Sequence, residues 1–143
     1  VSNAEVFAKS GVKILSSFSR LTHLAFGCEN SNIELLKQTA DAHKNTAVQS
    51  LVAKEMQNGS YYPKAIESAV RAIYGDKTAE ILATPNNVLA VEYLKALPSN
   101  ISPLPIRREG VEHDSENTEN GFASASYTRT IKARQKYYGV CSF

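Results

Sequence analysis

Two adjacent asparagines, Asn86 and Asn87, are the residues of this sequence best suited to bind a small molecule. They follow Thr84 and Pro85, a pair typical of a helix start, because threonine can cap the first turn and proline lacks the N–H that would be unpaired there. Apolar residues then recur with helical spacing until Pro98. Amide side chains at the positive end of a helix can hold a phosphate or a ribose hydroxyl. The alternative interpretation is that both asparagines only help to cap the helix.

The composition indicates a single domain and excludes several other classes of protein. With 143 residues, 43% of them hydrophobic, the chain can build one core, and a net charge of +2 is too small to predict nucleic-acid binding by itself. Cys28 and Cys141 lie far apart, and no cysteine or histidine pair has metal-ligand spacing, so we expect neither a metal site nor a disulfide framework. No apolar run approaches the roughly 20 residues of a membrane span, and no signal-peptide pattern is present. We therefore expect a cytoplasmic protein without a membrane partner.

The first helix is predicted to begin at a capping box formed by Ser2 and Glu5. Its middle contains the small residues Ser10 and Gly11, which would let another backbone or a ligand come close. Apolar side chains recur on one face and are expected to point into the core: Val6, Phe7, Ile14, Leu15 and Phe18.

Two short extended segments, residues 21–27 and 101–107, enclose a helical stretch. Ser31 and Glu34 form a second capping box at the start of that stretch. Helices are predicted over residues 31–58 with a break near Asn45, over 63–75, over 85–97 and, after a polar loop at 108–121, over 124–138. Because a strand, helices and a second strand favour parallel pairing through a helical crossover, we predict a helix-rich α/β fold.

A parallel sheet of two strands is unusually small, since such sheets normally have several strands and both faces covered. The first helix also begins with no strand before it, and the sequence starts with Val1 rather than Met. We interpret residues 1–143 as one fragment of a longer protein whose missing strands precede Val1. Another chain, or a second copy of this one through self-association, would then cover the exposed sheet edge. The alternative is a small helical domain with one minor sheet.

Several segments of this chain, taken in order, resemble a known family. They are residues 5–15, 24–30, 59–64 and 85–97, then Arg108 to Gly110 with His113 and Asp114, and finally 122–126 with Arg129. In this order they resemble the middle part of the bacterial tRNA(Met) cytidine acetate ligases, which belong to the HIGH-motif nucleotidyltransferase group. The resemblance covers nearly all of the chain and is weakest after Arg129. It implies the C-terminal part of a Rossmann-like nucleotidyltransferase sheet with a helical insertion.

The resemblance implies a reaction in two steps. ATP, with Mg²⁺, and acetate would give acetyl-adenylate, and the acetyl group would pass to N4 of the wobble cytidine of elongator tRNA(Met). The family carries a His-x-Gly-His motif in its first strand–helix turn, whereas His23, His43 and His113 of this sequence show no such spacing. We therefore assign no catalytic residue and expect this chain to be inactive alone. The competing hypothesis is a non-catalytic helical module that binds RNA or another protein.

The resemblance also suggests which residues bind ATP. Asn87 matches the ATP-contacting asparagine of the family, and Asn86 is the alternative if the register shifts by one. Arg108 resembles the ATP-binding arginine, and Arg107 is a near-equal candidate because the stretch that follows is one residue shorter here. Without the resemblance, arginines at the end of an extended run are most often only solvated.

Further carried-over positions lie near both ends of the chain. Ser10 and Gly11 fall where the family often has glycine and alanine in a backbone contact with ATP. Ser124 and Ser126, followed by Arg129, resemble the second nucleotidyltransferase signature, in which hydroxyls and helix amides receive phosphates. A plain helix cap would explain the two serines equally simply.

Three other features have both a functional and a structural interpretation. The segment that ends in Cys28 and Glu29 follows the end of a predicted strand, the usual ligand side of an α/β sheet, but we expect Cys28 to be a small buried residue. The charged residues around His113 are expected to be solvated. Cations mixed with tyrosines near the C-terminus suit RNA contacts or a solvated helix end: Lys132, Arg134 and Lys136.

Overall fold

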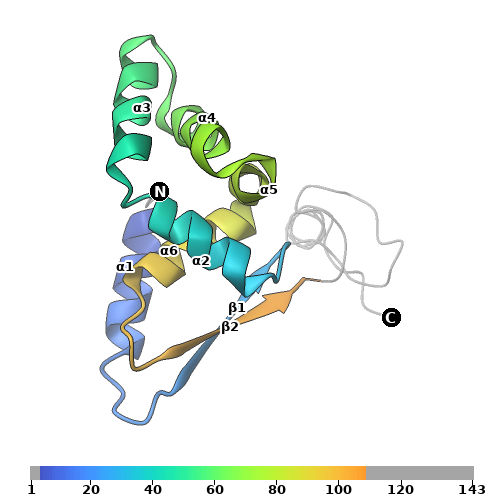
Figure 1. The fold of residues 1–143 in the computed structure, drawn as a ribbon. Helices are drawn as coiled ribbons and strands as arrows, with labels where there is room; N and C mark the ends of the chain where they lie inside the picture. Colours follow the sequence, from blue (N-terminus) through green and yellow to red (C-terminus); the bar gives the residue numbers. More distant parts are fainter. Residues whose placement is uncertain (1–3, 109–143) are drawn as a thin grey trace, which may run out of the picture. The chain divides into compact units, whose positions relative to one another are not determined.

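The structure is a computed structural model that describes residues 4–108 (Figure 1). Its elements follow one another as α1 (Ala4–Leu15), β1 (His23–Cys28), α2 (Ile33–Ala42), α3 (Thr46–Gln57), α4 (Tyr62–Tyr74), α5 (Asp76–Ala79), the 3₁₀ helix η1 (Glu80–Ala83), α6 (Pro85–Ala96) and β2 (Ser102–Arg107). The capping box at Ser2 and the helix predicted over 124–138 lie outside the described residues. The same is true of these predicted site residues: Ser124, Ser126, Arg129, Lys132, Arg134 and Lys136.

The two strands pair in parallel, as predicted, and form a two-stranded sheet in the described part of the chain. The register runs from His23 opposite Ser102 to Cys28 opposite Arg107. The helices α2 to α6 and η1 all lie between the two strands in the sequence, which confirms the helix-rich α/β class with a helical crossover. β1 begins two residues later than predicted because the N–H of Leu21 is still engaged in a turn, donating to Phe18 O at 3.1 Å.

Two apolar clusters form the core. One lies among the helices, where α3 packs against α4. The other lies where β1, α2, η1 and α6 meet and includes Phe26, Leu36, Ile81 and Val91. In this second cluster the Phe26 ring also packs against Tyr93, with ring centroids 5.7 Å apart. This cluster anchors α2 and α6 beside β1, and the first turns of both helices therefore have a defined place near the end of the strand.

The prediction of which face of α1 points into the core is wrong. Ala8 and Val12 are the buried residues of this helix, and α1 packs against α6. Small side chains at the contact let the two helix backbones approach closely, so the larger apolar residues are turned away. These residues are between 38% and 65% exposed: Val6, Phe7, Ile14, Leu15 and Phe18.

The helices begin close to the predicted positions, but the capping residue of α2 differs from the predicted one. The cap of α2 is Asn32 rather than Ser31, and its Oδ1 accepts from the N–H groups of Glu34 at 3.1 Å and Leu35 at 3.2 Å. The predicted break near Asn45 is confirmed, because Asn45 caps α3 and its Oδ1 accepts from Ala47 N at 2.8 Å. An asparagine amide satisfies a first-turn donor that would otherwise lack a partner.

His43 ends α2 in a partly buried position, where its Nδ1–H donates to Thr39 O at 2.8 Å. Burial lowers the pKa of His43 below its usual 6.5, and this outweighs the hydrogen bond, which favours the charged ring. The fold therefore prefers the neutral ring, whereas the unfolded chain takes up a proton first. Its contribution to stability is complete above pH 6.5 and falls as the pH drops below that value.

We expect the free energy of unfolding of this chain to decrease on acidification from about pH 7.5 to about pH 5.5, and His43→Gln to flatten that dependence. The pKa values of Glu5 and Glu29 are lowered below 4.5, so these carboxylates stay ionised across the range. Urea unfolding at a series of pH values measures the effect. An equally steep dependence in His43→Gln would show that His43 is not its source.

Candidate functional site

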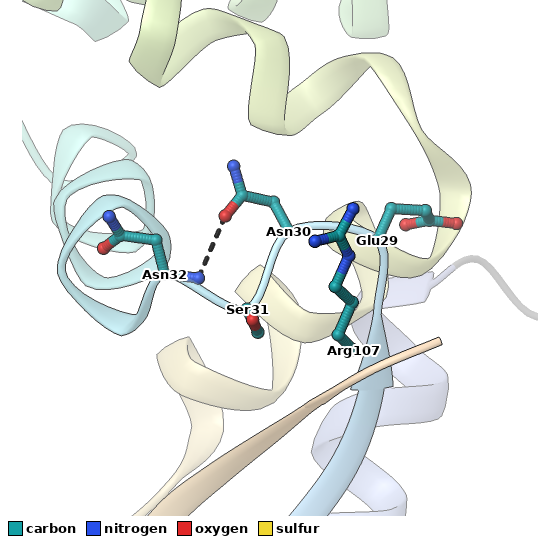
Figure 2. A pocket seen from close by; sticks show the side chains of 5 residues that line it. All are labelled: Glu29, Asn30, Ser31, Asn32 and Arg107. Carbon is teal, nitrogen blue, oxygen red and sulfur yellow. Dashed lines mark hydrogen bonds between the residues drawn. The ribbon is translucent and has the colours of Figure 1, made fainter. Parts of the chain in front are cut away.

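A pocket of about 410 Å³ opens at the carboxyl-terminal edge of the sheet (Figure 2). The loop after β1 lines it with Glu29, Asn30, Ser31 and Asn32, and the end of β2 contributes Arg107. This edge is where open α/β sheets bind ligands, and the volume falls within the range of about 300–1,000 Å³ that is typical of small-molecule sites. Each of these lining residues is polar or charged, which suits a charged or strongly polar ligand.

Hydrogen bonds within the loop hold it in place and occupy part of its donor capacity. Asn30 Oδ1 accepts from Asn32 N at 2.9 Å, a bond that Figure 2 shows. Asn32 in turn uses its Oδ1 to cap two amides of α2. Those amides are therefore not free for a ligand, and an anion in the pocket would depend on the positive end of the helix dipole and on side-chain donors.

Arg107 is the cation of this pocket. It is exposed at the end of β2, opposite Cys28 in the register, and makes no ion pair with any carboxylate of residues 4–108. Figure 2 shows its side chain extending from β2 toward the loop that carries Glu29 and Asn30. A guanidinium presents several donors in one plane and suits a phosphate or a carboxylate.

The first turn of α6 is joined to the pocket loop by reciprocal hydrogen bonds. Asn87 Oδ1 accepts from Glu29 N and from Asn30 N, each at 2.9 Å. In the other direction, the Glu29 carboxylate accepts from Asn87 N at 2.9 Å and from Asn86 Nδ2. We call this set of four bonds the Glu29–Asn87 clamp. It joins both asparagines to a residue that lines the pocket.

The electrostatics of Glu29 follow from the clamp. Partial burial raises the pKa of its carboxyl, but the interactions with Asn86, with Thr84 and with the backbone amides of Glu29 and Asn87 together outweigh burial, and the pKa lies below its usual 4.5. The hydroxyl of Thr84 acts in the same direction, although its buried Oγ1 makes no hydrogen bond of ordinary geometry. Glu29 is therefore ionised at neutral pH and places a negative charge at the start of α6.

A family model described as HIGH Nucleotidyl Transferase matches residues 1–140 of this chain.

The chain belongs to the HIGH nucleotidyl transferase family.

Relatives and solved structures agree with this assignment. A tRNA(Met) cytidine acetate ligase of Acetivibrio thermocellus is 32% identical over 136 residues, which cover 90% of this chain and 33% of that protein. The enzyme of the same name from Caldanaerobacter subterraneus is 36% identical over 148 residues, which cover 95% of this chain and 37% of that protein. The resemblance to these ligases seen in the sequence is thus confirmed. The chain spans about one third of the length of the curated relatives it matches.

Two crystal structures of Thermotoga maritima TmcAL have the same fold. The apo form matches with a TM-score of 0.84 at 26% identity and covers 96% of this chain and 35% of that one. The form bound with alpha-thio ATP matches with a TM-score of 0.76 at 25% identity, and the match covers 97% of this chain and 34% of that one. The nucleotidyl transferase fold of this chain therefore has a neighbour that binds an ATP analogue.

Within this nucleotidyl transferase chain, the predicted site residues separate into two groups. Arg107 lines the pocket, and Asn86 and Asn87 bind Glu29, which lines it as well. Arg108 follows β2 as an exposed residue outside the strand. Ser10 and Gly11 lie in α1 and do not line the pocket: Ser10 is exposed, and a Cβ at Gly11 would meet no atom within 4 Å. The expected close approach at Gly11 is not found among the described residues.

We expect Gly11→Ala to raise the free energy of unfolding by about 0.5–1 kcal/mol, because alanine is the better residue inside a helix and the space beside Gly11 is open. Urea unfolding of the two proteins measures the difference. The matched control is Gly75→Ala, which should destabilise because Gly75 has a φ of +86°. A loss of stability in Gly11→Ala would mean that a segment outside residues 4–108 packs against this position.

Three other features considered in the sequence can be compared with the structure. Cys28 is buried, as expected, with its Sγ 3.6 Å from Ile106 O, and burial, followed by the charge of Glu29, raises the pKa of its thiol. A raised pKa makes a thiol a poorer nucleophile at neutral pH. Residues 4–108 contain no cluster of three or more side chains that could hold a metal ion. None of the helices described is both long and apolar enough to cross a membrane.

Sequence reasoning missed the role of Glu29. The position of this residue after a strand end indicated the ligand side of the sheet, but nothing in the local pattern pairs it with Asn86 and Asn87. The pairing joins residues 57 and 58 positions apart. A carboxylate just after a strand, together with a helix start that has a poor local cap, is the signal that could have suggested it.

Proposed function

We propose that this chain is part of an ATP-dependent ligase of the cytoplasm that activates acetate and acetylates N4 of the wobble cytidine of elongator tRNA(Met). The names of the curated relatives and the alpha-thio ATP in a structural neighbour support this proposal. The observation that carries it is the pocket at the carboxyl edge of the sheet, with Arg107 at one side and the start of α2 at the other. This arrangement suits a nucleotide with its phosphates near a cation and a helix N-terminus.

The proposed chemistry is a displacement at phosphorus followed by acyl transfer. An acetate oxygen attacks the α-phosphorus of ATP, and the bond to the bridging oxygen of pyrophosphate breaks as acetyl-adenylate forms. The cytidine amine then attacks the acetyl carbon, AMP leaves, and the amine loses a proton. The protein contributes positioning and charge stabilisation at the phosphates, which are the main requirements of phosphoryl chemistry.

We assign ATP-binding roles from this geometry and from the family resemblance. Arg107 or Arg108 would meet the phosphates, and Asn87, with Asn86 beside it, would contact the nucleotide from the first turn of α6. We expect Mg²⁺ to arrive with the phosphates of ATP, because phosphate oxygens and water are its usual ligands in such sites. The remaining candidates keep their proposed roles: Ser10, Gly11, Ser124, Ser126 and Arg129 toward ATP, and Lys132, Arg134 and Lys136 toward tRNA.

We further propose that residues 1–143 are part of a longer protein, the parent, whose preceding strands carry a His-x-Gly-His turn. That the relatives are about three times as long as the matched region is consistent with this proposal. In the parent, the preceding strands would extend the sheet beyond the pair described here. A mass measurement of the native protein tests this directly.

Acetate-dependent exchange of labelled pyrophosphate into ATP by the parent tests the first step, with a reaction lacking acetate as the control. Labelled acetate should then enter elongator tRNA(Met), but not a transcript in which uridine replaces the wobble cytidine. Exchange without acetate dependence would contradict the proposed acid substrate. Equal labelling of both transcripts would contradict the proposed target base.

A further inference from the structure

The side-chain amide of Asn87 has one defined orientation. Asn87 is only 3% exposed, and its Oδ1 accepts from two backbone N–H groups, those of Glu29 and Asn30. A carbonyl-type oxygen has two lone pairs, so both are used. Rotating the amide by 180° would set its NH₂ group against the same two donors, and the hydrogen-bond network therefore excludes that orientation.

The fixed orientation leaves Asn87 with a donor and no acceptor to offer. Nδ2 makes no hydrogen bond within residues 4–108, and it is not among the polar atoms sealed from solvent. A largely buried side chain that satisfies one end of its amide and leaves the other open is uncommon, because unpaired polar groups are costly. The open donor suits an acceptor atom of a ligand, such as a ring nitrogen or an oxygen.

Glu29 determines where this donor lies. Thr84 occupies the cap position of α6 but makes no capping bond with its side chain. The Glu29 carboxylate replaces that cap: it accepts from Asn87 N and from Asn86 Nδ2, although Glu29 comes 58 positions before Asn87 in the sequence. The first turn of α6 is thus held from the pocket loop rather than by its own sequence, and Asn87 depends on Glu29 for its position.

We propose that Glu29 is a positioning residue of the ATP site, which holds the first turn of α6 so that Asn87 Nδ2 donates to an acceptor atom of the nucleotide. This inference rests on the proposed function, because it takes ATP as the ligand. Glu29 itself need not touch ATP, and its negative charge would be unfavourable beside a phosphate. Its contribution is the geometry of the Glu29–Asn87 clamp.

The test measures ATP binding with Mg²⁺ to the parent by titration calorimetry, with circular dichroism as the check of folding. Glu29→Ala should weaken binding about 10-fold, the expected effect of losing one well-placed hydrogen bond. Glu29→Gln should retain most of the affinity, because its oxygen can accept from Asn87 N while Asn86 turns its own amide to accept from the new NH₂ group. Glu67→Ala is the matched control, since Glu67 lies in α4, does not line the pocket, pairs only with Arg71 of the same helix and should leave binding unchanged.

A double-mutant cycle separates positioning from a general loss of stability. Asn87→Asp keeps an oxygen for the two backbone amides and removes the donor, so it should weaken ATP binding while the fold remains. In that background Glu29→Ala should cause no further loss. Should Glu29→Ala not fold, Glu29→Asp takes its place in the cycle, because a carboxylate one methylene shorter cannot bridge both asparagines and should weaken binding several-fold.

Three results would overturn the inference. They are binding by Glu29→Ala as tight as by Glu67→Ala, losses that multiply in the cycle, and full affinity in Asn87→Asp. An absence of ATP binding by the unaltered parent is a different result, because it removes the proposed function itself. Weak binding confined to Glu29→Ala, Glu29→Asp and Asn87→Asp supports both the inference and the proposed function.

Discussion

The 143-residue chain, purified alone, is expected to show no acetate-dependent exchange of pyrophosphate into ATP. Adenylation needs donors that hold the triphosphate and donors that meet the charge developing at the α-phosphorus, all in one preorganised site. Among residues 4–108 the chain supplies Arg107, the loop after β1 and the asparagines of α6, but no His-x-Gly-His turn occurs anywhere in its sequence. With so few contacts, the favourable free energy of binding would be too small to offset the entropy that ATP loses when it is held in the site.

The parent, assayed in parallel, is the control for this prediction, and it should exchange pyrophosphate under the same conditions. Exchange by the isolated chain clearly above a blank without protein would mean that the catalytic groups lie within its 143 residues. The proposal that preceding strands complete the site would then be wrong.

In the parent, Arg107→Ala is expected to weaken ATP binding by about 1–3 kcal/mol, or about 5–150-fold in Kd, the usual loss for a hydrogen bond to a charged group. The reason is its place: the guanidinium lines the pocket and makes no ion pair within residues 4–108, so it is free to meet a phosphate. Arg107→Lys should recover only part of the affinity, because a single ammonium cannot reproduce a planar pair of donors.

Two further variants give this experiment its comparison. Arg108→Ala tests the neighbouring arginine that the family resemblance favours, and the larger loss of the two identifies the phosphate ligand. Arg20→Ala removes the same charge from an exposed position before β1, at the opposite edge of the sheet, and should bind ATP normally. A similar loss in Arg20→Ala and Arg107→Ala would indicate a general electrostatic effect rather than a contact.

Patterns confined to neighbouring residues predicted most of the fold. Pro85 at a helix start, Asn45 at a break and Gly75 at a helix end are all where the sequence indicated, because caps, proline and glycine act through backbone geometry within one turn. The parallel pairing also followed from the order of strands and helices. The order of short motifs identified the family for the same reason, since motifs are local.

Contacts between distant segments decided the rest. The spacing of apolar residues in α1 could not reveal that Ala8 and Val12, rather than Phe7 and Ile14, face α6, because two faces of that helix are apolar and only the partner selects one. The amides of Asn86 and Asn87 were identified from the sequence as binding groups, but their direction was not. The Asn87 amide is oriented by the backbone N–H groups of Glu29 and Asn30, and the Asn86 amide donates to the Glu29 carboxylate. These bonds join segments far apart in the sequence and form only when the chain folds.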